Sequence, residues 1–435
     1  MCSNKNIFIL FFLTFFPLIT FGQKSVTLEE CISHALENNY SVKISGNQLQ
    51  IAENNVTLAP FLPTITLGSK QSANSMQQRN FAEDGLSYNS NTTGASVISS
   101  ANLIWRIFDG LSMFVSKDKQ QELLTKEQLN FRSVVENLVM KISTQYYLII
   151  SLQNQVKLLS ELVGISQIRH NQSFTKYSIG SSSGLEYKQA KIYLNSDSSK
   201  LLLQSENVKN AYIELFRLMN MPLDSPVIIN DTIIPEPLLS VNHLIKSGSE
   251  NNTELLASKS GERVAQLDIK LAKSALYPTL DFSTGYNYNL TQNLYFSSKY
   301  NEANGYNWGF NLSIPVFDGN ELNRKIKNAK ITRDNAALSY QQARQNLESE
   351  LFQLYNIYTN NLRLIEFEKE SKEAAFMNLE AAMEKYRLGA LSGIEFRDIQ
   401  LSYLDASDRM LNTIYQAKIS EITLHLLVGD LFRSK

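Results

Sequence analysis

Apolar and polar residues alternate along two stretches of the second half of the chain. Apolar side chains occupy most second positions over 280–290 and again over 306–316. A period of two is typical of β-strands that have one apolar and one polar face. We therefore predict a β-hairpin over about 279–316, with a polar loop at about 291–304. The apolar face of this hairpin carries the aromatic residues Phe282, Tyr286, Trp308 and Phe310.

The first half of the chain shows the same pattern less regularly. Ile65 and Leu67 precede a polar segment at about 72–92, and alternating apolar residues up to Ile107 follow it, which predicts a second hairpin over about 64–108. Each alternating run spans about ten residues, which is the length that a tilted strand needs to cross a bilayer. Alternation alone leaves another interpretation open, a half-buried hairpin of a soluble β-sandwich.

Helical sequence follows each predicted hairpin. Asp109-Gly110 and Asp318-Gly319 are expected to start helices, because an aspartate can accept the free amide hydrogens of a first turn. The segments 111–177 and 320–387 contain no proline. A helix of some 65 residues is a rod of roughly 100 Å. In the second segment a seven-residue grid, typical of helices wound around neighbours, is formed by Ala329, Ala336, Ala343, Ile357 and Leu364.

Shorter elements are predicted before and after these rods. Glycine-containing turns at 180–184 and 389–393 reverse the chain into return helices that end near Met219 and Val428. Thr27 and Glu30 have the spacing of a capping box and open a short helix that ends near Asn39, before a second helix to about residue 59.

The chain repeats itself at a nearly constant offset. Lys176–Gly180 reappears as Lys385–Gly389, and Asp109-Gly110 reappears as Asp318-Gly319, both 209 residues later. Collinear matches of this kind indicate a duplicated unit. We divide the chain into a signal peptide (1–22), a first repeat (23–220), a connector (221–240) and a second repeat (241–435).

The first 22 residues predict export. Lys5 precedes an apolar run over 7–21 that ends at Gly22, and this run is too short for a membrane span but suits a secretory signal. We expect the mature chain to begin at Gln23 and to keep Cys31 as its one cysteine, so no disulfide forms within it.

The charge balance, the histidine positions and the turn motifs give little support to a site that binds nucleic acid, a metal ion or an enzyme substrate. The 41 basic residues nearly balance the 42 acidic ones, and no basic run of the kind that neutralises phosphates occurs. The four histidines are separated from one another and from Cys31, so no metal site is expected. Gly180–Gly184 matches the G-x-S-x-G pattern of serine hydrolases, but a helix rather than a strand precedes it, and Leu391 stands at the nucleophile position of the duplicate. We predict no enzyme activity and no cofactor.

The duplicated helix, hairpin and long-helix unit resembles the TolC-like outer-membrane efflux family. The phrases that carry the resemblance are Leu62-Pro63-Thr64, Pro315–Gly319 and Tyr386–Gly389, and it covers essentially all of the mature chain. It implies an α+β membrane protein in which each chain gives four strands to a trimeric transmembrane β-barrel. A long coiled-coil α-helical barrel would continue below it in the periplasm. Backbone groups at an open sheet edge stay unsatisfied in lipid, so association is also expected on physical grounds.

The resemblance also implies partners and an exit-duct function. A Gram-negative outer membrane would hold the barrel, with its apolar strand face toward lipid. A periplasmic membrane-fusion adaptor and an inner-membrane pump of the RND, ABC or MFS type would deliver cargo to the turns at 180–184 and 389–393. The expected adaptor-contacting tip residues are Tyr177, Gly180, Tyr386, Leu388, Gly389 and Leu391.

Acidic residues after the two turns are candidates for the pore constriction. In the family, acids at the positions of Glu186, Glu395 and Asp398 line the narrowest part of the tunnel, and Gln189 replaces a fourth. Asp398 lies three residues after Glu395 and thus on the same helix face, while Arg397 points away. Three copies would gather nine carboxylates, which would attract cations and raise some of their own pKa values. A solvated helix face is the alternative.

Two questions stay open at this level. An exported periplasmic coiled-coil scaffold without transport activity would explain the helices, although not two aromatic hairpins at matching places. Drug efflux, metal-ion efflux and type I protein secretion share the same conduit, so the cargo is open. Family members with an arginine just after the turn use it to hold the entrance shut, and Leu391 at that place puts this ion pair in doubt.

Overall fold

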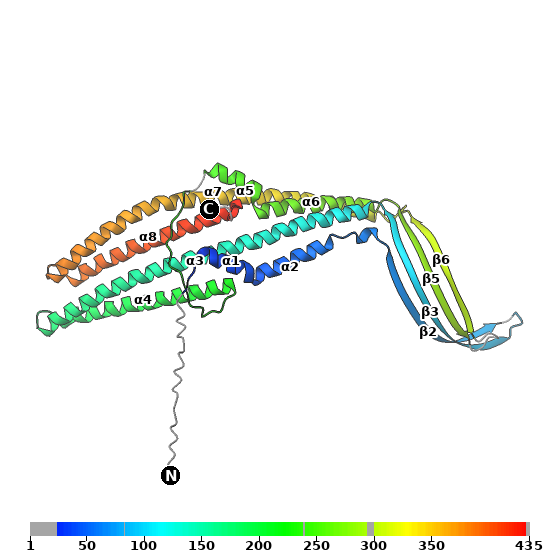
Figure 1. Ribbon diagram of the computed structural model, residues 1–435, viewed down its shortest axis with the longest axis horizontal. Coiled ribbons are helices and arrows are strands. Elements are labelled where there is room, and N and C mark those ends of the chain that lie inside the picture. The colour runs from blue at the N-terminus through cyan, green and yellow to red at the C-terminus, as the bar shows by residue number, and fades with distance from the viewer. Residues whose placement is uncertain (1–23, 82, 238–239, 294–299, 432–435) are drawn as a thin grey trace, which may run out of the picture. The chain divides into compact units, whose positions relative to one another are not determined.

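The computed structural model describes residues 24–81, 83–237, 240–293 and 300–431. The expected signal peptide lies outside these residues. The order of elements is helix–hairpin–helix, given twice (Figure 1). The elements are β1 (Lys24–Ser25), α1 (Leu28–Asn38), α2 (Tyr40–Asn55), η1 (Ala59–Phe61), β2 (Thr64–Phe81), β3 (Ser87–Asp109), α3 (Ser112–Ser178), α4 (Gly184–Met219), β4 (Val227–Ile228), α5 (Val241–Asn251), α6 (Thr253–Ser274), β5 (Thr279–Asn293), β6 (Tyr300–Ser313), α7 (Glu321–Arg387) and α8 (Gly393–Val428).

The chain folds into two compact units. Each of the long helices α3, α7 and α8 has one part in each unit. Within the described residues, the first unit combines residues 24–35, Ile142–Ile234 and Ile365–Tyr415, and it holds both helical turns. The second combines Leu36–Lys141, Pro235–Leu364 and Gln416–Lys435, and it holds the four-stranded sheet.

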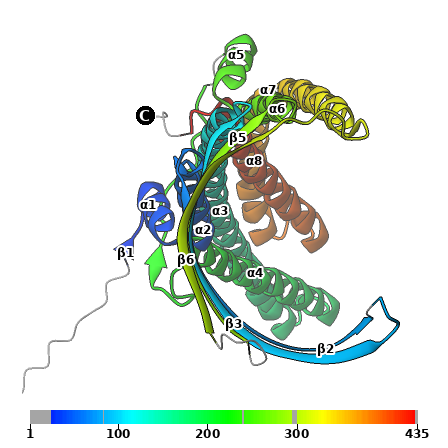
Figure 2. The same ribbon diagram turned by 90° about the vertical axis from the view of Figure 1, so that its right-hand side faces the viewer.

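The sheet of the second unit is antiparallel throughout, with the order β2-β3-β5-β6. Its strands lie side by side and are strongly curved (Figure 2). Phe282 lies opposite Phe310, and Tyr286 lies opposite Tyr306. The ring centroids of these two pairs are 5.2 and 4.9 Å apart, so the predicted aromatic face of the second hairpin is confirmed.

The predicted polar loop at 72–92 is wrong. β2 runs to Phe81, and β3 begins at Ser87, so most of the polar segment is paired strand. The β3–β5 pairing begins only at Gly94, which leaves residues 75–93 as a free two-stranded extension. Polar residues on both faces of this extension abolish the alternation on which the prediction depended. In the second hairpin β5 reaches Asn293 and β6 starts at Tyr300, and part of the expected loop lies outside the described residues.

Helix starts follow the predicted capping chemistry. A carboxylate oxygen of Asp109 accepts the amide hydrogen of Met113 at 3.1 Å, and Asp318 accepts that of Leu322 at 2.7 Å. At the start of α1 the amide of Glu30 donates to the hydroxyl of Thr27 at 3.3 Å, and the reciprocal bond is also 3.3 Å. The Asp-Gly starts and the capping box are therefore confirmed. Each of these side-chain bonds determines where a helix begins, which helix propensity alone does not do.

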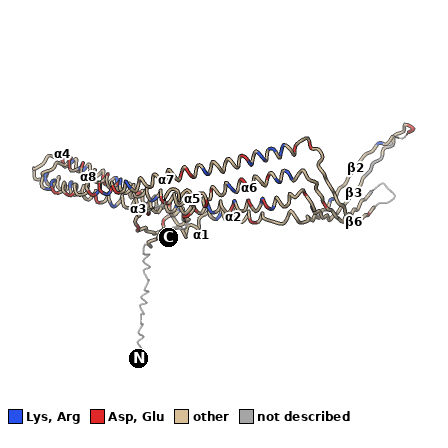
Figure 3. The backbone as a smooth tube through the Cα atoms, turned by 90° about the horizontal axis from the view of Figure 1, so that it is seen from above, with Lys and Arg blue, Asp and Glu red and all other residues tan. Residues whose placement is uncertain are grey.

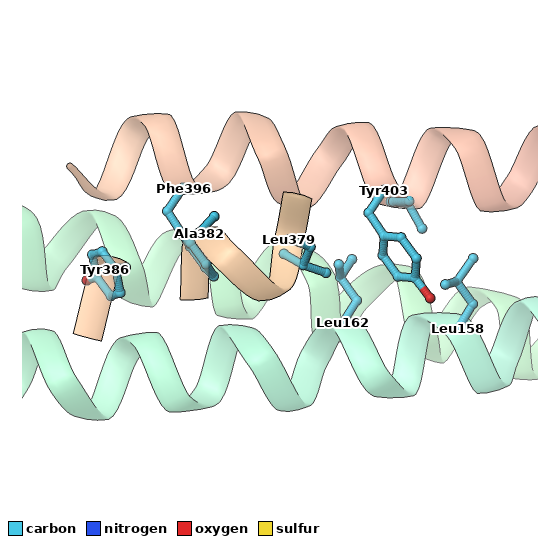
Figure 4. Packing of buried hydrophobic residues seen from close by; sticks show 8 residues of the cluster. Leu158, Leu162, Leu379, Ala382, Tyr386, Phe396 and Tyr403 are labelled. Carbon is cyan, nitrogen blue, oxygen red and sulfur yellow. The ribbon is translucent and has the colours of Figure 1, made fainter. Parts of the chain in front are cut away.

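An apolar core packs the helices of the first unit together. Leu162 of α3, Leu379 and Ala382 of α7, and Phe396 and Tyr403 of α8 are buried in one cluster (Figure 4). The cluster joins a helix of the first repeat with two helices of the second. It holds the helices beside both turns in fixed places, which gives the side chains there a defined geometry.

The residues of the predicted heptad grid in α7 differ in burial within one chain. Ala329, Ala336 and Ala343 are half-buried, whereas Ile357 is exposed and the buried seam of this chain passes through Leu351 and Tyr358. Charged residues of both signs lie along the helices, while the strands carry few (Figure 3). Within the described residues, every helix falls short of the length and apolar character needed to span a membrane.

Candidate channel entrance at the two helical turns

The two turns of the first unit have the same backbone geometry. Gly180 and Gly389 both adopt a left-handed conformation, with φ of 74° and 76°. The next amide in each turn donates to a carbonyl five residues back, from Ser181 to Lys176 at 2.8 Å and from Ala390 to Lys385 at 2.9 Å. These bonds satisfy the last carbonyls of the preceding helix, and the left-handed position favours glycine.

Stacked aromatic rings brace both turns in the same way. Tyr177 stacks on Tyr187 with centroids 5.8 Å apart, and Tyr386 stacks on Phe396 at 5.1 Å. Each member of the second pair lies 209 residues after its counterpart in the first. Gly184 leaves room for the ring of Tyr177, to which a Cβ at that position would come as close as 3.2 Å. The internal repeat is thus visible in side-chain packing as well as in sequence.

Glu186 joins the two turns. Its carboxylate accepts the hydroxyl hydrogen of Ser182 at 2.7 Å and that of Tyr386 at 3.4 Å. Tyr386 is buried and also bonds the hydroxyl of Ser173 at 3.1 Å. Burial raises the pKa of the Tyr386 phenol above its ordinary value, so this group stays a neutral donor. Glu186 is therefore half-buried and held in place, rather than free in solvent.

Glu395, the sequence counterpart of Glu186, has a different local role. It accepts the amide hydrogen of Ser392 at 3.0 Å, and its own amide donates to the Ser392 hydroxyl at 3.2 Å, which is a capping box at the start of α8. The bond from the Ser392 amide holds the pKa of the exposed Glu395 carboxyl below its ordinary value. Asp398 is also exposed, and within the described part of the chain its carboxylate forms no ion pair.

A buried ion pair lies beside these residues, between Arg397 near the start of α8 and Asp197 of α4. Both guanidinium Nη atoms of Arg397 donate to the carboxylate of Asp197 at 2.7 Å, and the side chains are 7% and 0% exposed. Ser166 donates to Asp197 at 2.6 Å, and Gln400 contacts both Arg397 and Ser166 at 3.0 Å. The network ties α4 and α8 to α3. As predicted, Arg397 does not neutralise its neighbours Glu395 and Asp398.

Sequence reasoning missed this network. Asp197 and Arg397 are 200 residues apart, which is not the repeat offset, so the search for repeats could not pair them. The polar run around Asp197 looks like a solvated helix face. Its burial follows from helices α3 and α8, which are distant in sequence.

The other predicted site residues lie in two places. At the turns, Leu388 is 77% exposed and Leu391 packs against the core cluster. In the sheet, Phe282, Tyr286, Trp308 and Phe310 share one face, because Thr284 lies opposite Trp308 in the same register that pairs Phe282 with Phe310. Arg106 and Asp281 form an ion pair at 2.8 Å on the opposite face.

The chain matches one family profile twice, over residues 31–221 and 244–430. These two matches cover most of the chain, and their ends at 221 and 430 reproduce the 209-residue offset. The chain belongs to the outer membrane efflux protein family. This result and the repeated element order agree on a duplicated unit.

Relatives and solved structures of this family extend over nearly the whole chain. The sequence is 21% identical to the outer membrane protein TolC of Escherichia coli K12 over 396 residues, which covers 87% of this chain and 76% of TolC. It is 22% identical to the cation efflux system protein CusC of E. coli O157:H7, covering 92% of this chain and 85% of CusC. The crystal structure of the Campylobacter jejuni CmeC outer membrane channel superposes with a TM-score of 0.77 at 15% identity, covering 99% and 94% of the two chains. The chain thus has the TolC-like fold.

Proposed function

We propose that the protein is the passive exit duct of a tripartite export system, assembled from three copies in the outer membrane. The observation that carries this proposal is the four-stranded sheet, whose edge strands β2 and β6 have no partner among the described residues. Four strands are too few to close a barrel, and open edges are costly in lipid. Three copies would supply twelve strands and pair every edge.

The two faces of the sheet suit lipid and water. One face of the second hairpin carries Phe282, Tyr286, Trp308 and Phe310, and the other carries Asn287, Asn307 and Asn311. Outward apolar and inward polar residues are the pattern of transmembrane barrels. The four aromatic residues would therefore contact lipid, and the asparagines would line the lumen.

The helical turns would form the periplasmic entrance and receive an adaptor that links the duct to an inner-membrane pump. Equivalent apolar side chains protrude from both turns, Ile179 and Leu185 from the first, and Leu388 and Ile394 from the second, all at least 68% exposed. Exposed apolar groups at the same places of two repeats fit a partner that contacts both turns alike. Tyr177, Gly180, Tyr386 and Gly389 hold the turns in shape, and Leu391 supports them from the core.

Glu186, Glu395 and Asp398 would form the constriction of this entrance. In three copies these carboxylates would make the opening selective for cations. The experiment is a reversal-potential measurement in planar bilayers on the purified protein and on a triple variant, Glu186→Gln, Glu395→Gln and Asp398→Asn. Glutamine can replace glutamate in a capping box, so the start of α8 should survive the change at Glu395.

We expect a cation-selective pore whose selectivity falls in the triple variant, because this variant removes the carboxylate charges. Glu384→Gln is the matched control, since this exposed carboxylate is already bound to Arg387 at 2.8 Å and should leave selectivity unchanged. Unchanged reversal potentials in a folded triple variant would remove the three acids from the pore. A folded protein that washes off membranes without detergent would instead support the alternative function, a periplasmic scaffold.

A further inference from the structure

The buried network at the ion pair leaves one cation without a carboxylate. Arg397 and Ser166 together take up both oxygens of Asp197. A second guanidinium, that of Arg169, lies 4.7 Å above the ring of Tyr193, and Arg397 lies 5.0 Å from the same ring. Two cations therefore share one aromatic ring and one acid, so the site carries a surplus positive charge.

Arg169 is poorly satisfied by its own chain. The residue is 4% exposed, and its Nη1 atom is buried without a hydrogen-bond partner among the described residues. Burial lowers the pKa of Arg169 from its ordinary value and the charge of Arg397 acts in the same direction, while Tyr386, Tyr193 and Asp197 oppose the shift. A buried guanidinium without a counter-charge is costly, and arginine does not escape this cost by losing its proton. We therefore expect an anion from another molecule to bind the guanidinium of Arg169.

A cavity of about 170 Å³ opens beside Arg169. One water needs only about 10–15 Å³ by a comparable measure, so the cavity can admit a side chain. Its walls come from α3, α7 and α8 of one chain and are largely apolar, with Ile165, Met383 and Phe396 among them. At the mouth Glu384 is paired with Arg387 at 2.8 Å, which neutralises the one acid in the lining.

We infer that this cavity is a socket for a single carboxylate carried by a helix of the periplasmic adaptor. The proposal rests on the proposed function, because it assumes that an adaptor docks at this end of the helices. Arg169 in a largely apolar lining, which includes the exposed Ile168 and Met383, is complementary to a glutamate or aspartate flanked by apolar residues. Apolar groups around such a contact exclude water and strengthen it.

An outside partner fits the cavity better than a second copy of this chain. One chain supplies all of the lining residues, so the socket exists before any copy joins. The adaptor carboxylate would give Arg169 a directly bonded partner, as Asp197 gives to Arg397. Arg169 would then determine which adaptors bind, since a helix without an acid at this position would leave the guanidinium unpaired.

The test measures binding of the purified adaptor from the same organism to the detergent-solubilised channel by biolayer interferometry. Arg169→Met removes the charge and keeps an apolar side chain of similar length, a change that buried sites tolerate. We expect it to weaken binding at least about tenfold, as loss of a charged hydrogen bond does. Arg409→Met, which removes a half-exposed arginine of α8 that does not line the cavity, is the matched control and should change affinity by less than about threefold. Arg169→Lys should recover part of the loss.

A double-mutant cycle then identifies the acidic adaptor residue that binds Arg169. Each acid of the adaptor helices is neutralised in turn and measured against both the wild-type channel and Arg169→Met. We expect one adaptor acid whose removal weakens binding to the wild type and has little further effect on the variant. Strictly additive effects for every acid, or wild-type affinity in Arg169→Met, would overturn the socket while leaving the duct intact.

Two other outcomes would also overturn the proposal. Loss of trimer in Arg169→Met with normal adaptor affinity in the remainder would assign the socket to a neighbouring copy. Failure of the wild-type channel to bind the adaptor would contradict the adaptor step of the proposed function itself. This outcome differs from failure of the socket alone, in which the wild type and Arg169→Met bind the adaptor equally well.

Discussion

The Asp197–Arg397 pair should dominate the local stability of the helices near the turns. Arg397→Met removes the guanidinium that donates to both oxygens of the Asp197 carboxylate, which is 0% exposed. Removal of one partner from a buried pair costs about 3–5 kcal/mol, and solvent screening does not reduce this value here because neither group is exposed. Three kcal/mol corresponds to roughly a 150-fold larger equilibrium constant for local opening.

Hydrogen exchange of the detergent-solubilised protein measures this opening directly. We expect amides of α4 around Asp197 and of α8 around Arg397 to exchange about a hundredfold or more faster in Arg397→Met. Arg409→Met is the matched control on the same helix. Arg409 bonds Glu368 at 3.0 Å from a half-exposed position, and surface pairs contribute only about 0–1 kcal/mol.

A second variant separates the charge from the packing. Asp197→Leu combined with Arg397→Met replaces the pair by apolar side chains, and such replacements are often neutral or stabilising. Its exchange should return toward that of the wild type. Equal exchange in the wild type and Arg397→Met would refute the reasoning, as would a double variant that is less stable than Arg397→Met.

Three further changes test other parts of the molecule. Phe310→Arg should reduce membrane assembly, with a cost of about 2–4 kcal/mol if the residue lies near the bilayer midplane. Asn311→Arg on the other face should fold and insert nearly normally, and equal assembly yields of the two variants would contradict the assigned faces. The bond of 2.9 Å to Asp430 raises the pKa of His425 above its ordinary value, so this pair stabilises the end of α8 most at low pH and loses its effect as the pH rises through the raised pKa. The protection of the amides at residues 425–430, taken relative to the exchange rate of an unstructured peptide at the same pH, should therefore fall from about pH 6 to 8 in the wild type and stay level in His425→Gln. Gly389→Ala should destabilise the second turn by about 1–2 kcal/mol, because φ of 76° strains a side chain there, and unchanged thermal unfolding would contradict this.

The long helices could be predicted because local chemistry marks their ends. Asp109 and Asp318 cap the starts of α3 and α7, and Gly180 and Gly389 end them in left-handed turns. The register of the second hairpin was also predictable, since a shift of one residue would move Phe282 to the polar face.

The remaining features depend on contacts that sequence spacing does not encode. The extension at 75–93 is polar on both faces, so it has strand pairing without strand alternation. Glu186 and Glu395 occupy equivalent positions, yet one bonds Tyr386 across the turns and the other caps its own helix. The Asp197–Arg397 network joins helices from different repeats, and only the packed structure brings its members together.

The central claim is that three exported copies form one duct, and native mass spectrometry of the detergent-solubilised protein tests it most directly. The account predicts a complex of three chains, each beginning at Gln23 after loss of residues 1–22. A well-folded single chain as the main species, or chains that retain Met1, would contradict it.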